Sequence, residues 1–375
     1  MTAVLHVISG LATGGAETTL MQIAGALHAR KLPQHVVSIG DRGAYADELE
    51  QRGVAVTTLG MKSAYGGLAG LFKLVRLVQR VQPKFIQGWM YHGNLMASLA
   101  DRLAHGRADR RLIWNLRASN MDEARYGWII RLTTAMSAWP DMVIANSQAG
   151  VAFHIARGYH PWRVELIANG IDVEKFQPNA AMRSAIRAEN GIPADAVLVI
   201  HAARVDPMKD HATFLAAMEA VPNVFGLLVG AGTKELRLPP NVRALGLRHD
   251  IGRFYACADI VVSTSAFGEG FSNAIAEGMS SGLVPIATDV GDARLIIGET
   301  GRIVATHDPA ALAEAIAAEA AIAPAERRSR GEPARKRILT HFSLSQAVDV
   351  YERVYLSFEF SQAGPIGREL TRSAK

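Results

Sequence analysis

The stretch VLHVISGLATGGAETTLMQIAGALHARKLPQHVVSI, residues 4–39, determines the fold class that the sequence predicts. Its two ends, Val4–Ser9 and Val36–Ile39, are short runs rich in β-branched residues, as is typical of buried strands. Between them, apolar residues recur at the spacing of one helix face: Leu20, Ile23, Ala24 and Leu27. A strand, a helix and a strand in this order form a βαβ unit, so we expect the chain to begin with a parallel α/β sheet.

The same alternation of strand and helix continues along the chain. Further strands are expected in the first half at Ala55–Leu59, Phe85–Gln87, Leu112–Leu116, Met142–Ala145 and Val164–Ala168. A second series is expected at Val197–His201, Phe225–Val229, Arg243–Leu245, Ile260–Ser263 and Val284–Ala287. Helical patterns separate these runs, so the sequence predicts two doubly wound, Rossmann-like parallel sheets with ligands bound at the carboxyl ends of the strands, in a cleft between the domains.

The domain boundary is expected where the strand series is interrupted. Asn169 to Asp172 give a turn signal after a strand, and a polar stretch follows Pro178. We therefore place one domain at residues 1–172 and a second at 173–345. A last helix is expected to start near Ser343. Residues 346–375 are expected to continue this helix, which packs back on the first domain, and to end in a loose tail.

The composition excludes several classes of protein. With 49% hydrophobic and 20% charged residues in 375 positions, the chain can bury two cores and is not of disordered composition. One cysteine, Cys257, cannot form an internal disulfide, and no Cys/His cluster has zinc-ligand spacing, so we expect a cytoplasmic protein without a metal. No basic leader precedes Val4, and charges interrupt the most apolar stretch, around Trp128–Ala145, so no membrane-spanning helix is expected.

Basic residues are concentrated in the first half of the chain, where 18 Lys and Arg stand against 12 Asp and Glu in residues 1–172. Within one helical stretch, Lys73, Arg76 and Arg80 share a face, which favours peripheral contact with an anionic membrane surface. The alternative is a helix that packs on the core and turns a solvated basic face outward. No nucleic-acid partner is expected.

Two loops carry residues suited to binding a diphosphate. Gly14 and Gly15 join the first strand to the first helix, where glycines allow close approach and the helix N-terminus offers N–H groups to an anion. A tight corner without a ligand is the alternative, and the spacing fits neither a dinucleotide nor a P-loop motif. In the second domain, Arg204 and Lys209 follow a strand end, although charges in a polar loop are also common without a ligand.

The most informative segment is FGEGFSNAIAE, residues 267–277. Glu269 lies in a glycine-flanked loop after a strand, and Ser272 is expected to cap the following helix. Glu277 lies one turn beyond Asn273 on the same helix face. The segment can therefore offer N–H groups to phosphate and two carboxylates to hydroxyl groups, whereas a pair of surface glutamates is the alternative.

At this point the chain resembles the retaining GT-B glycosyltransferases of family 4, the glycosyl transferases group 1. Their signature is two glutamates separated by seven residues, which Glu269 and Glu277 match. Further matches occur in the family's order at residues 14–17, Asn146-Ser147, residues 169–172, Arg204 with Lys209, and residues 230–232. Residues 114–122 are similar to a subset of members associated with bacterial surface-polysaccharide assembly.

The resemblance implies a role for each matched residue. The first domain would bind the acceptor and the second the nucleotide sugar. Gly14 and Gly15 would back the donor diphosphate, which Arg204 and Lys209 would bind. Residues around the signature would hold the donor, with Glu269 on the sugar, backbone N–H groups of Gly270, Phe271, Ser272 and Asn273 on the phosphates, and Glu277 on the ribose. The base would rest near Leu247 and Arg248, and His92 is the candidate for the family's histidine in the first-domain cleft.

The predicted function is a metal-independent retaining hexosyltransferase without a cofactor. It would move a sugar from a nucleoside-diphosphate sugar, with uridine favoured over guanosine as the nucleoside, to a glycan or lipid-linked acceptor. The expected process is assembly of exopolysaccharide, capsule or lipopolysaccharide. A departure from the family pattern is Ala202-Ala203, where members often have glycine before the diphosphate arginine. Two alternatives remain open: a catalytically silent nucleotide-sugar-binding subunit, and a GT-B sugar-nucleotide epimerase.

Overall fold

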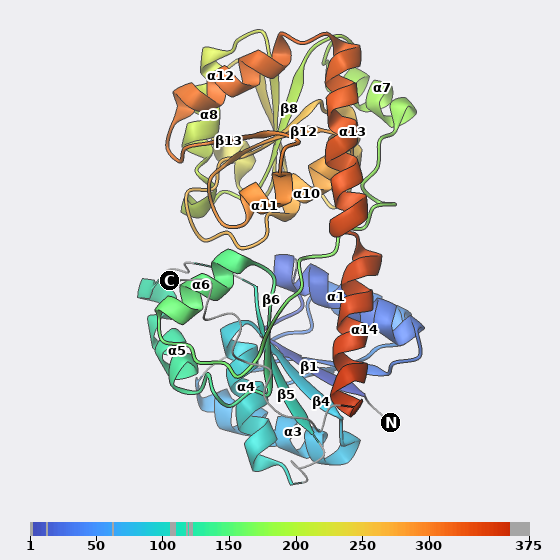
Figure 1. Ribbon diagram of the computed structural model, residues 1–375, viewed down its shortest axis with the longest axis vertical. Helices are drawn as coiled ribbons and strands as arrows, with labels where there is room; N and C mark the ends of the chain where they lie inside the picture. The colour runs from blue at the N-terminus through green and yellow to red at the C-terminus, as the bar shows by residue number, and fades with distance from the viewer. Residues whose placement is uncertain are drawn as a thin grey trace. The chain divides into compact units, whose positions relative to one another are not determined.

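The computed structural model describes residues 3–12, 14–61, 64–105, 110–117, 119 and 123–360. Parts of the loops singled out above, Thr13, Ala118 and residues 120–122, lie outside these ranges, as does the predicted tail. The chain divides into two compact units: Met1–Ala168 with Ser345–Lys375, and Asn169–Leu344. Each unit is built on a parallel sheet (Figure 1).

The first unit contains a seven-stranded sheet in the order β3-β2-β1-β4-β5-β6-β7, and every neighbouring pair is parallel. The strands are β1 Val4–Ile8, β2 Gln34–Ser38, β3 Ala55–Thr58, β4 Phe85–Trp89, β5 Arg111–Leu116, β6 Met142–Ala145 and β7 Val164–Leu166. The chain order reverses between β1 and β4, which is the switch point where doubly wound sheets bind ligands.

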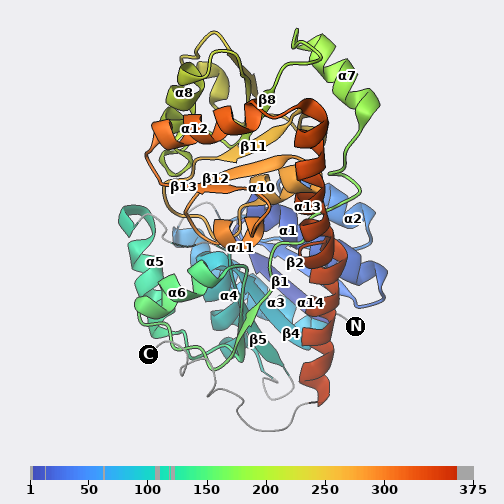
Figure 2. The same cartoon turned by 45° about the horizontal axis from the view of Figure 1, so that its top comes forward.

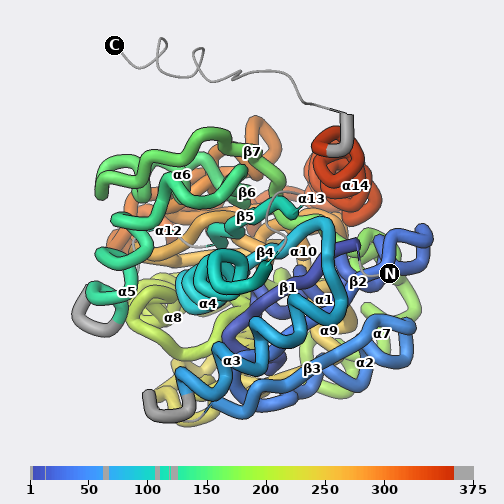
Figure 3. Tube along the Cα trace, turned by 90° about the horizontal axis from the view of Figure 1, so that it is seen from below, coloured from blue at the N-terminus to red at the C-terminus, as the bar shows by residue number. Residues whose placement is uncertain are grey.

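Helices connect these strands: α1 Gly15–Ala29, α2 Tyr45–Gln51, α3 Ala64–Val81, α4 Met90–Leu103, α5 Glu123–Ala135 and α6 Gln148–Ala156. Buried residues of α3 and α4, such as Leu74 and Ala97, share one core with Val7 and Ile86 of the sheet. In Figure 3, α3 and α4 lie side by side, in agreement with this packing.

The last helix, α14 Leu344–Phe360, belongs mainly to the first unit although it follows the second in sequence. The Tyr355 ring packs against Phe85 of β4 at 5.1 Å between centroids. Its hydroxyl donates a hydrogen bond to Gln87 Oε1. The chain therefore returns to β4 of the first unit through aromatic residues that α14 buries.

The second unit contains a six-stranded parallel sheet in the order β10-β9-β8-β11-β12-β13. Its strands are β8 Leu198–Ala202, β9 Phe225–Val229, β10 Val242–Gly246, β11 Ile260–Ser263, β12 Val284–Thr288 and β13 Arg302–Val304. The helices are α7 Ala180–Glu189, α8 His211–Ala220, α9 Ile251–Cys257, α10 Asn273–Ser280, α11 Ala293–Ile297, α12 Pro309–Ala320 and α13 Pro324–His341, with 3₁₀ turns at Pro207–Lys209 and Thr233–Glu235.

Packing of this sheet follows the burial of its strands. Phe214 of α8 and Leu312 of α12 share a core with Val199 and Ile260. In Figure 2, α12 lies on one side of β11 and β12, and α10 and α11 lie on the other. Both faces of the sheet are covered, so the predicted α/β class with two Rossmann-like sheets is confirmed.

Two elements differ from the sequence prediction. The edge strand β13 was not predicted. The charged stretch before the last helix is itself helical as α13, even though it contains Pro333. Buried Arg327 holds the start of α13 by donating to the Glu319 and Ile322 carbonyls.

Within the described part of the chain, no helix is both long and apolar enough to cross a membrane.

Candidate functional site

The loop after β8 places two cations at the carboxyl end of the second sheet. Asp206 accepts a hydrogen bond from the Met208 amide at 3.0 Å and thereby starts the 3₁₀ turn that ends at Lys209. Arg204 pairs with Asp206 through Nη2 at 2.9 Å, and its side chain stays 61% exposed. The Arg204 guanidinium is thus held near the strand end and remains accessible to a ligand.

Lys209 meets Glu269 from the neighbouring strand's loop. The Lys209 ammonium contacts Glu269 Oε1, and Ser265 Oγ donates to the same oxygen at 2.9 Å. The backbone of Lys209 is fixed in turn, because Thr264 Oγ1 donates to its carbonyl at 2.8 Å. The structure therefore brings together two predicted site residues that are 60 positions apart.

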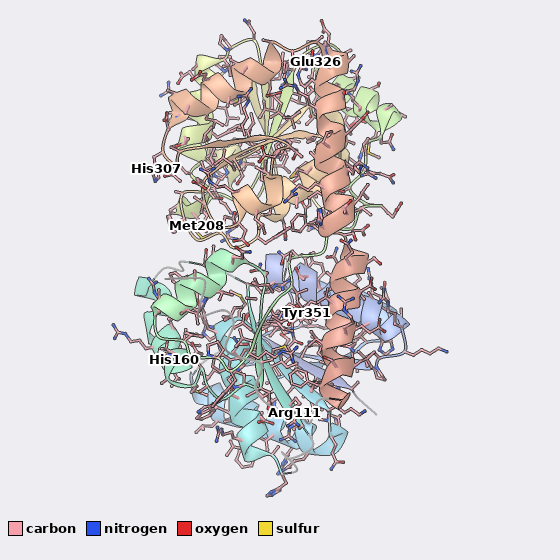
Figure 4. The ribbon with its side chains drawn as sticks, viewed as in Figure 1. Arg111, His160, Met208, His307, Glu326 and Tyr351 are labelled. Atoms are coloured by element: carbon pink, nitrogen blue, oxygen red, sulfur yellow. The ribbon has the colours of Figure 1, made fainter. Side chains whose placement is uncertain are left out.

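The glycine-rich loop that carries Glu269 fits tightly against its surroundings. Gly268 has a φ of +79°, and a Cβ there would lie 2.8 Å from Met208 Sδ. The Gly270 carbonyl accepts a hydrogen bond from the Asp292 amide at 3.0 Å. Phe271 packs on Phe342 with ring centroids 5.5 Å apart. Figure 4 labels Met208 at this end of the second unit.

Ser272 occupies the N-cap position of α10, but its side chain makes no capping hydrogen bond, so that sequence prediction was wrong. The backbone at Ser272, with φ −79° and ψ 98°, is extended as in most N-cap residues, so the missing cap reflects the orientation of the side chain. Its Oγ is buried without a partner among the described residues. Asn273 Oδ1 accepts from Asn169 Nδ2 at 2.7 Å. The first turn of α10 thus lacks a side-chain cap, which suits an incoming anion.

Glu277 lies one turn into α10 in a setting that favours its neutral form. Burial raises the pKa of Glu277 to about 7, while the Tyr255 hydroxyl and the Lys175 ammonium oppose this rise. Glu277 is partly exposed, so water still reaches part of the residue. A carboxyl group in this position can accept hydrogen bonds from two vicinal hydroxyl groups once it is ionised.

The two residues predicted near the base follow β10. Leu247 is 58% exposed. Arg248 pairs with Asp250 through Nη2 at 2.8 Å and lies 5.1 Å from the Phe254 ring. A planar ligand could pack against the exposed side chain of Leu247 and bind the guanidinium of Arg248, which Asp250 holds in place.

The remaining predicted residues belong to the first unit. Gly14 is the N-cap of α1 in extended conformation, and Gly15 is the first helical residue, with no side chain capping the helix. His92 lies in the first turn of α4, which follows β4 directly. Its ring meets Trp128 edge-on at 6.0 Å, and partial burial lowers the pKa of His92.

Sequence reasoning missed Ser265, which donates to Glu269, and Tyr255, whose buried hydroxyl lowers the pKa of Glu277. Ser265 comes four residues before Glu269 in the loop after β11, and this spacing was an available signal. Tyr255 gave none, because its proximity to Glu277 depends on how α9 packs. Across the described ranges, no group of three His, Cys, Asp or Glu side chains could hold a metal ion.

The two parallel sheets have the GT-B architecture, and comparisons with known proteins identify the family. Residues 13–175 match the model of Glycosyltransferase Family 4, and residues 196–319 match Glycosyl transferases group 1. Both matches fall on the order of domains described above. The chain belongs to the family 4, group 1 glycosyltransferases.

Individual relatives are more distant. The chain is 25% identical over 322 residues to the putative glycosyltransferase EpsF of Bacillus subtilis, covering 76% of this chain and 79% of EpsF. It is 25% identical over 370 residues to the lipopolysaccharide core biosynthesis glycosyltransferase LpsD of Rhizobium meliloti, covering 93% and 96%. The crystal structure of Anabaena Alr3699/HepE in complex with UDP superposes with a TM-score of 0.83 at 23% identity, covering 95% of this chain and 100% of HepE.

Proposed function

We propose that the protein transfers a hexose-type sugar from a uridine-diphosphate sugar to a glycan or lipid-linked acceptor during assembly of a surface polysaccharide. The name of LpsD, a lipopolysaccharide core biosynthesis glycosyltransferase, supports a role in lipopolysaccharide assembly, and EpsF is named as a glycosyltransferase. HepE, which shares the fold, has been crystallised with UDP and with UDP-glucose, which supports the uridine donor. The cytoplasm is the proposed compartment, with reaction at the inner face of the membrane.

The observation that carries this proposal is the meeting of Lys209 and Glu269 beside the uncapped start of α10. Breaking a sugar–phosphate bond builds negative charge on the departing nucleoside diphosphate. Lys209, the accessible Arg204 and the first N–H groups of α10 would stabilise that charge, so these groups can act without a metal ion. Gly14 and Gly15 would approach the diphosphate from the first unit.

The carboxylates would hold the two sugars of the donor. Glu269 would bind hydroxyl groups of the transferred hexose, because its Oε1 contacts Lys209, which is proposed to bind the phosphate next to that sugar. Glu277 would bind the ribose, and Leu247 with Arg248 would contact the base. The proposed stereochemistry is retention, with the acceptor hydroxyl attacking from the face that the diphosphate leaves. His92 would lie near the reacting carbon.

Peripheral membrane binding is part of the same proposal, and α3 supports it. Leu68 and Phe72, one turn apart, are 77% and 68% exposed. The helix carries three basic residues, Lys73, Arg76 and Arg80, and no acidic residue. Apolar side chains flanked by cations are suited to an anionic lipid surface.

A nucleotide-sugar screen tests the proposal when donor loss and glycoside formation are measured together. The full chain is incubated with uridine- and guanosine-diphosphate sugars, with and without membrane extract as a source of acceptor. Glycoside formation from a uridine donor is expected, and Lys209→Met serves as the matched inactive variant. Donor isomerisation without acceptor would indicate an epimerase instead, and binding without consumption would indicate a silent subunit.

A further inference from the structure

Arg117, the residue directly after β5, differs from the other buried arginines. Four arginines of the described residues are buried: Arg110, Arg117, Arg187 and Arg327. Arg110 pairs with Asp101 at 2.8 Å, and Arg187 pairs with Asp259 at 2.7 Å. Arg327 donates to three backbone carbonyls. In each of these three cases, burial of the guanidinium is compensated by acceptors within the protein.

Arg117 has little such compensation. Its Nη1 makes two long contacts, 3.4 Å to Asn115 Oδ1 and 3.3 Å to the Tyr351 hydroxyl. Its Nε and Nη2 are buried with no hydrogen-bond partner. Among the described residues, no carboxylate forms an ion pair with it, and burial lowers the pKa of Arg117. Only 9% of the residue is exposed.

The surroundings of Arg117 favour an anion. The guanidinium lies 5.2 Å from the ring of Trp89, the N-cap residue of the 14-residue helix α4. The N-cap residue makes no side-chain capping hydrogen bond, which leaves the first N–H groups of α4 open. Because α4 follows β4 directly, these groups lie at the same carboxyl edge of the sheet as Arg117. Tyr351 reaches this edge from α14, as Figure 4 shows, and its hydroxyl already accepts from Asn115 Nδ2 at 2.9 Å. Two residues of the same edge thus share one neutral acceptor.

A buried cation without acceptors is costly, and proteins retain such a group where a ligand supplies the acceptors. The two open nitrogens of Arg117, Nε and Nη2, form the edge of the guanidinium that binds two oxygens side by side. Phosphoryl groups present oxygens in this arrangement. The aromatic ring of Trp89 lies beside the cation, 5.2 Å from the guanidinium carbon.

We infer that Arg117 binds a phosphoryl group of a substrate through Nε and Nη2 at the carboxyl edge of the first sheet. The inference deepens the proposed transferase function and rests on it. The group belongs either to a lipid-linked acceptor phosphate or to the donor diphosphate. Because both nitrogens are covered in the ligand-free chain, binding requires local opening around Arg117.

A stability comparison separates a ligand-binding arginine from a structural one. The melting temperature of ligand-free Arg117→Met is expected to equal or exceed that of the parent, because an uncompensated buried charge has been removed. Arg110→Met is the matched control, and its melting temperature should fall because Asp101 loses its buried partner. A loss in Arg117→Met as large as in Arg110→Met would overturn the inference, while UDP binding by that variant would still support the transferase.

Anion binding gives the second readout. Calorimetry with pyrophosphate is performed on the Arg204→Met variant. This variant lacks one of the proposed phosphate-binding cations of the second unit, so binding at Arg117 makes a larger part of the signal. Adding Arg117→Met is expected to weaken pyrophosphate binding at least about tenfold, and an unchanged affinity would overturn the inference. UDP titration of the single Arg117→Met variant then identifies the source. A weakened UDP affinity assigns the phosphoryl group to the donor, and an unchanged one assigns it to the acceptor.

Discussion

The ammonium of Lys209 contacts the carboxylate of Glu269 across two neighbouring loops of the second unit. Each side chain is mostly buried, and each is proposed to bind a different part of the same donor. In the ligand-free protein they neutralise each other. Donor binding is therefore expected to break this contact, so that Lys209 pairs with the phosphate and Glu269 accepts hydrogen bonds from the sugar hydroxyls.

This contact predicts strong coupling between the two residues in transfer kinetics. Lys209→Met and Glu269→Gln should each lower kcat/KM by about 100-fold, and the double variant should lose much less than the product of the two. The coupling energy is expected to be about 1–3 kcal/mol. A double-mutant cycle measures it, and strictly additive losses would show that the contact has no part in turnover.

The two glutamates are expected to differ in their kinetic effects. Glu277→Ala should mainly raise the donor KM, because a ribose contact is equally strong in ground and transition states. Glu269→Ala should instead lower kcat by roughly 100-fold, because it loosens the sugar whose anomeric carbon reacts.

Nucleotide calorimetry supplies the control for this assignment. Free nucleoside diphosphate contains ribose but no hexose, so its affinity should fall for Glu277→Ala and stay nearly unchanged for Glu269→Ala. If both variants bind nucleotide and turn over like the parent, the glutamates are only parts of a loop and a helix surface.

Sequence periodicity was sufficient to predict the two sheets because buried strands such as β1 and β8 leave short, mostly apolar runs. The same reasoning missed α13, because Pro333 and its many charges resemble a loop until tertiary contacts such as those of Arg327 are known. Local propensity is a weak guide wherever packing decides the outcome.

Motif spacing predicted the glutamate pair but not the environment of each carboxylate. Residue type and spacing do not show whether a side chain is paired, and the contact of Lys209 with Glu269 arises only when the fold brings their two loops together. Arg117 illustrates the same limit, since burial without an acceptor is a property of the folded chain. The unused hydroxyl of Ser272 is a third example.

Transfer is expected to proceed without a divalent cation. Lys209, Arg204 and the start of α10 already supply positive charge and N–H dipoles where the leaving diphosphate is proposed to bind. Initial rates in excess EDTA should match those in buffer alone. Loss of activity that Mg²⁺ or Mn²⁺ restores would contradict this expectation.

Substitutions on α3 should weaken membrane binding. Leu68→Ser with Phe72→Ser removes exposed apolar surface, and Lys73→Glu with Arg76→Glu reverses the charge that attracts anionic lipid. Each basic residue near such a surface contributes about 1 kcal/mol, so the charge variant should lower partitioning to anionic vesicles more than tenfold.

Co-sedimentation with anionic and neutral vesicles measures this partitioning. Leu339→Ser, which alters an exposed apolar residue of α13, is the matched control and should bind like the parent. Equal partitioning of all variants would leave α3 as a helix with a solvated basic face.

The raised pKa of Glu277 predicts how stability depends on pH. Burial raises the pKa of this carboxyl from its ordinary value of 4.5 to about 7 in the folded chain, so between these values the folded state binds more protons than the unfolded state. The stability that the neutral carboxyl contributes is complete below pH 4.5 and is lost as the pH rises through about 7. Above that range, ionised Glu277 costs about 2 kcal/mol, after allowance for its partial exposure.

Glu277→Gln, which stays neutral, should therefore melt about 4–8 °C above the parent at pH 8.5 and close to it at pH 4.5. Glu219→Gln, at an exposed position of α8, is the control and should follow the parent at both pH values. Melting curves across this range test the assignment, and a Glu277→Gln curve parallel to the parent's would show that folding does not raise the pKa of this carboxyl.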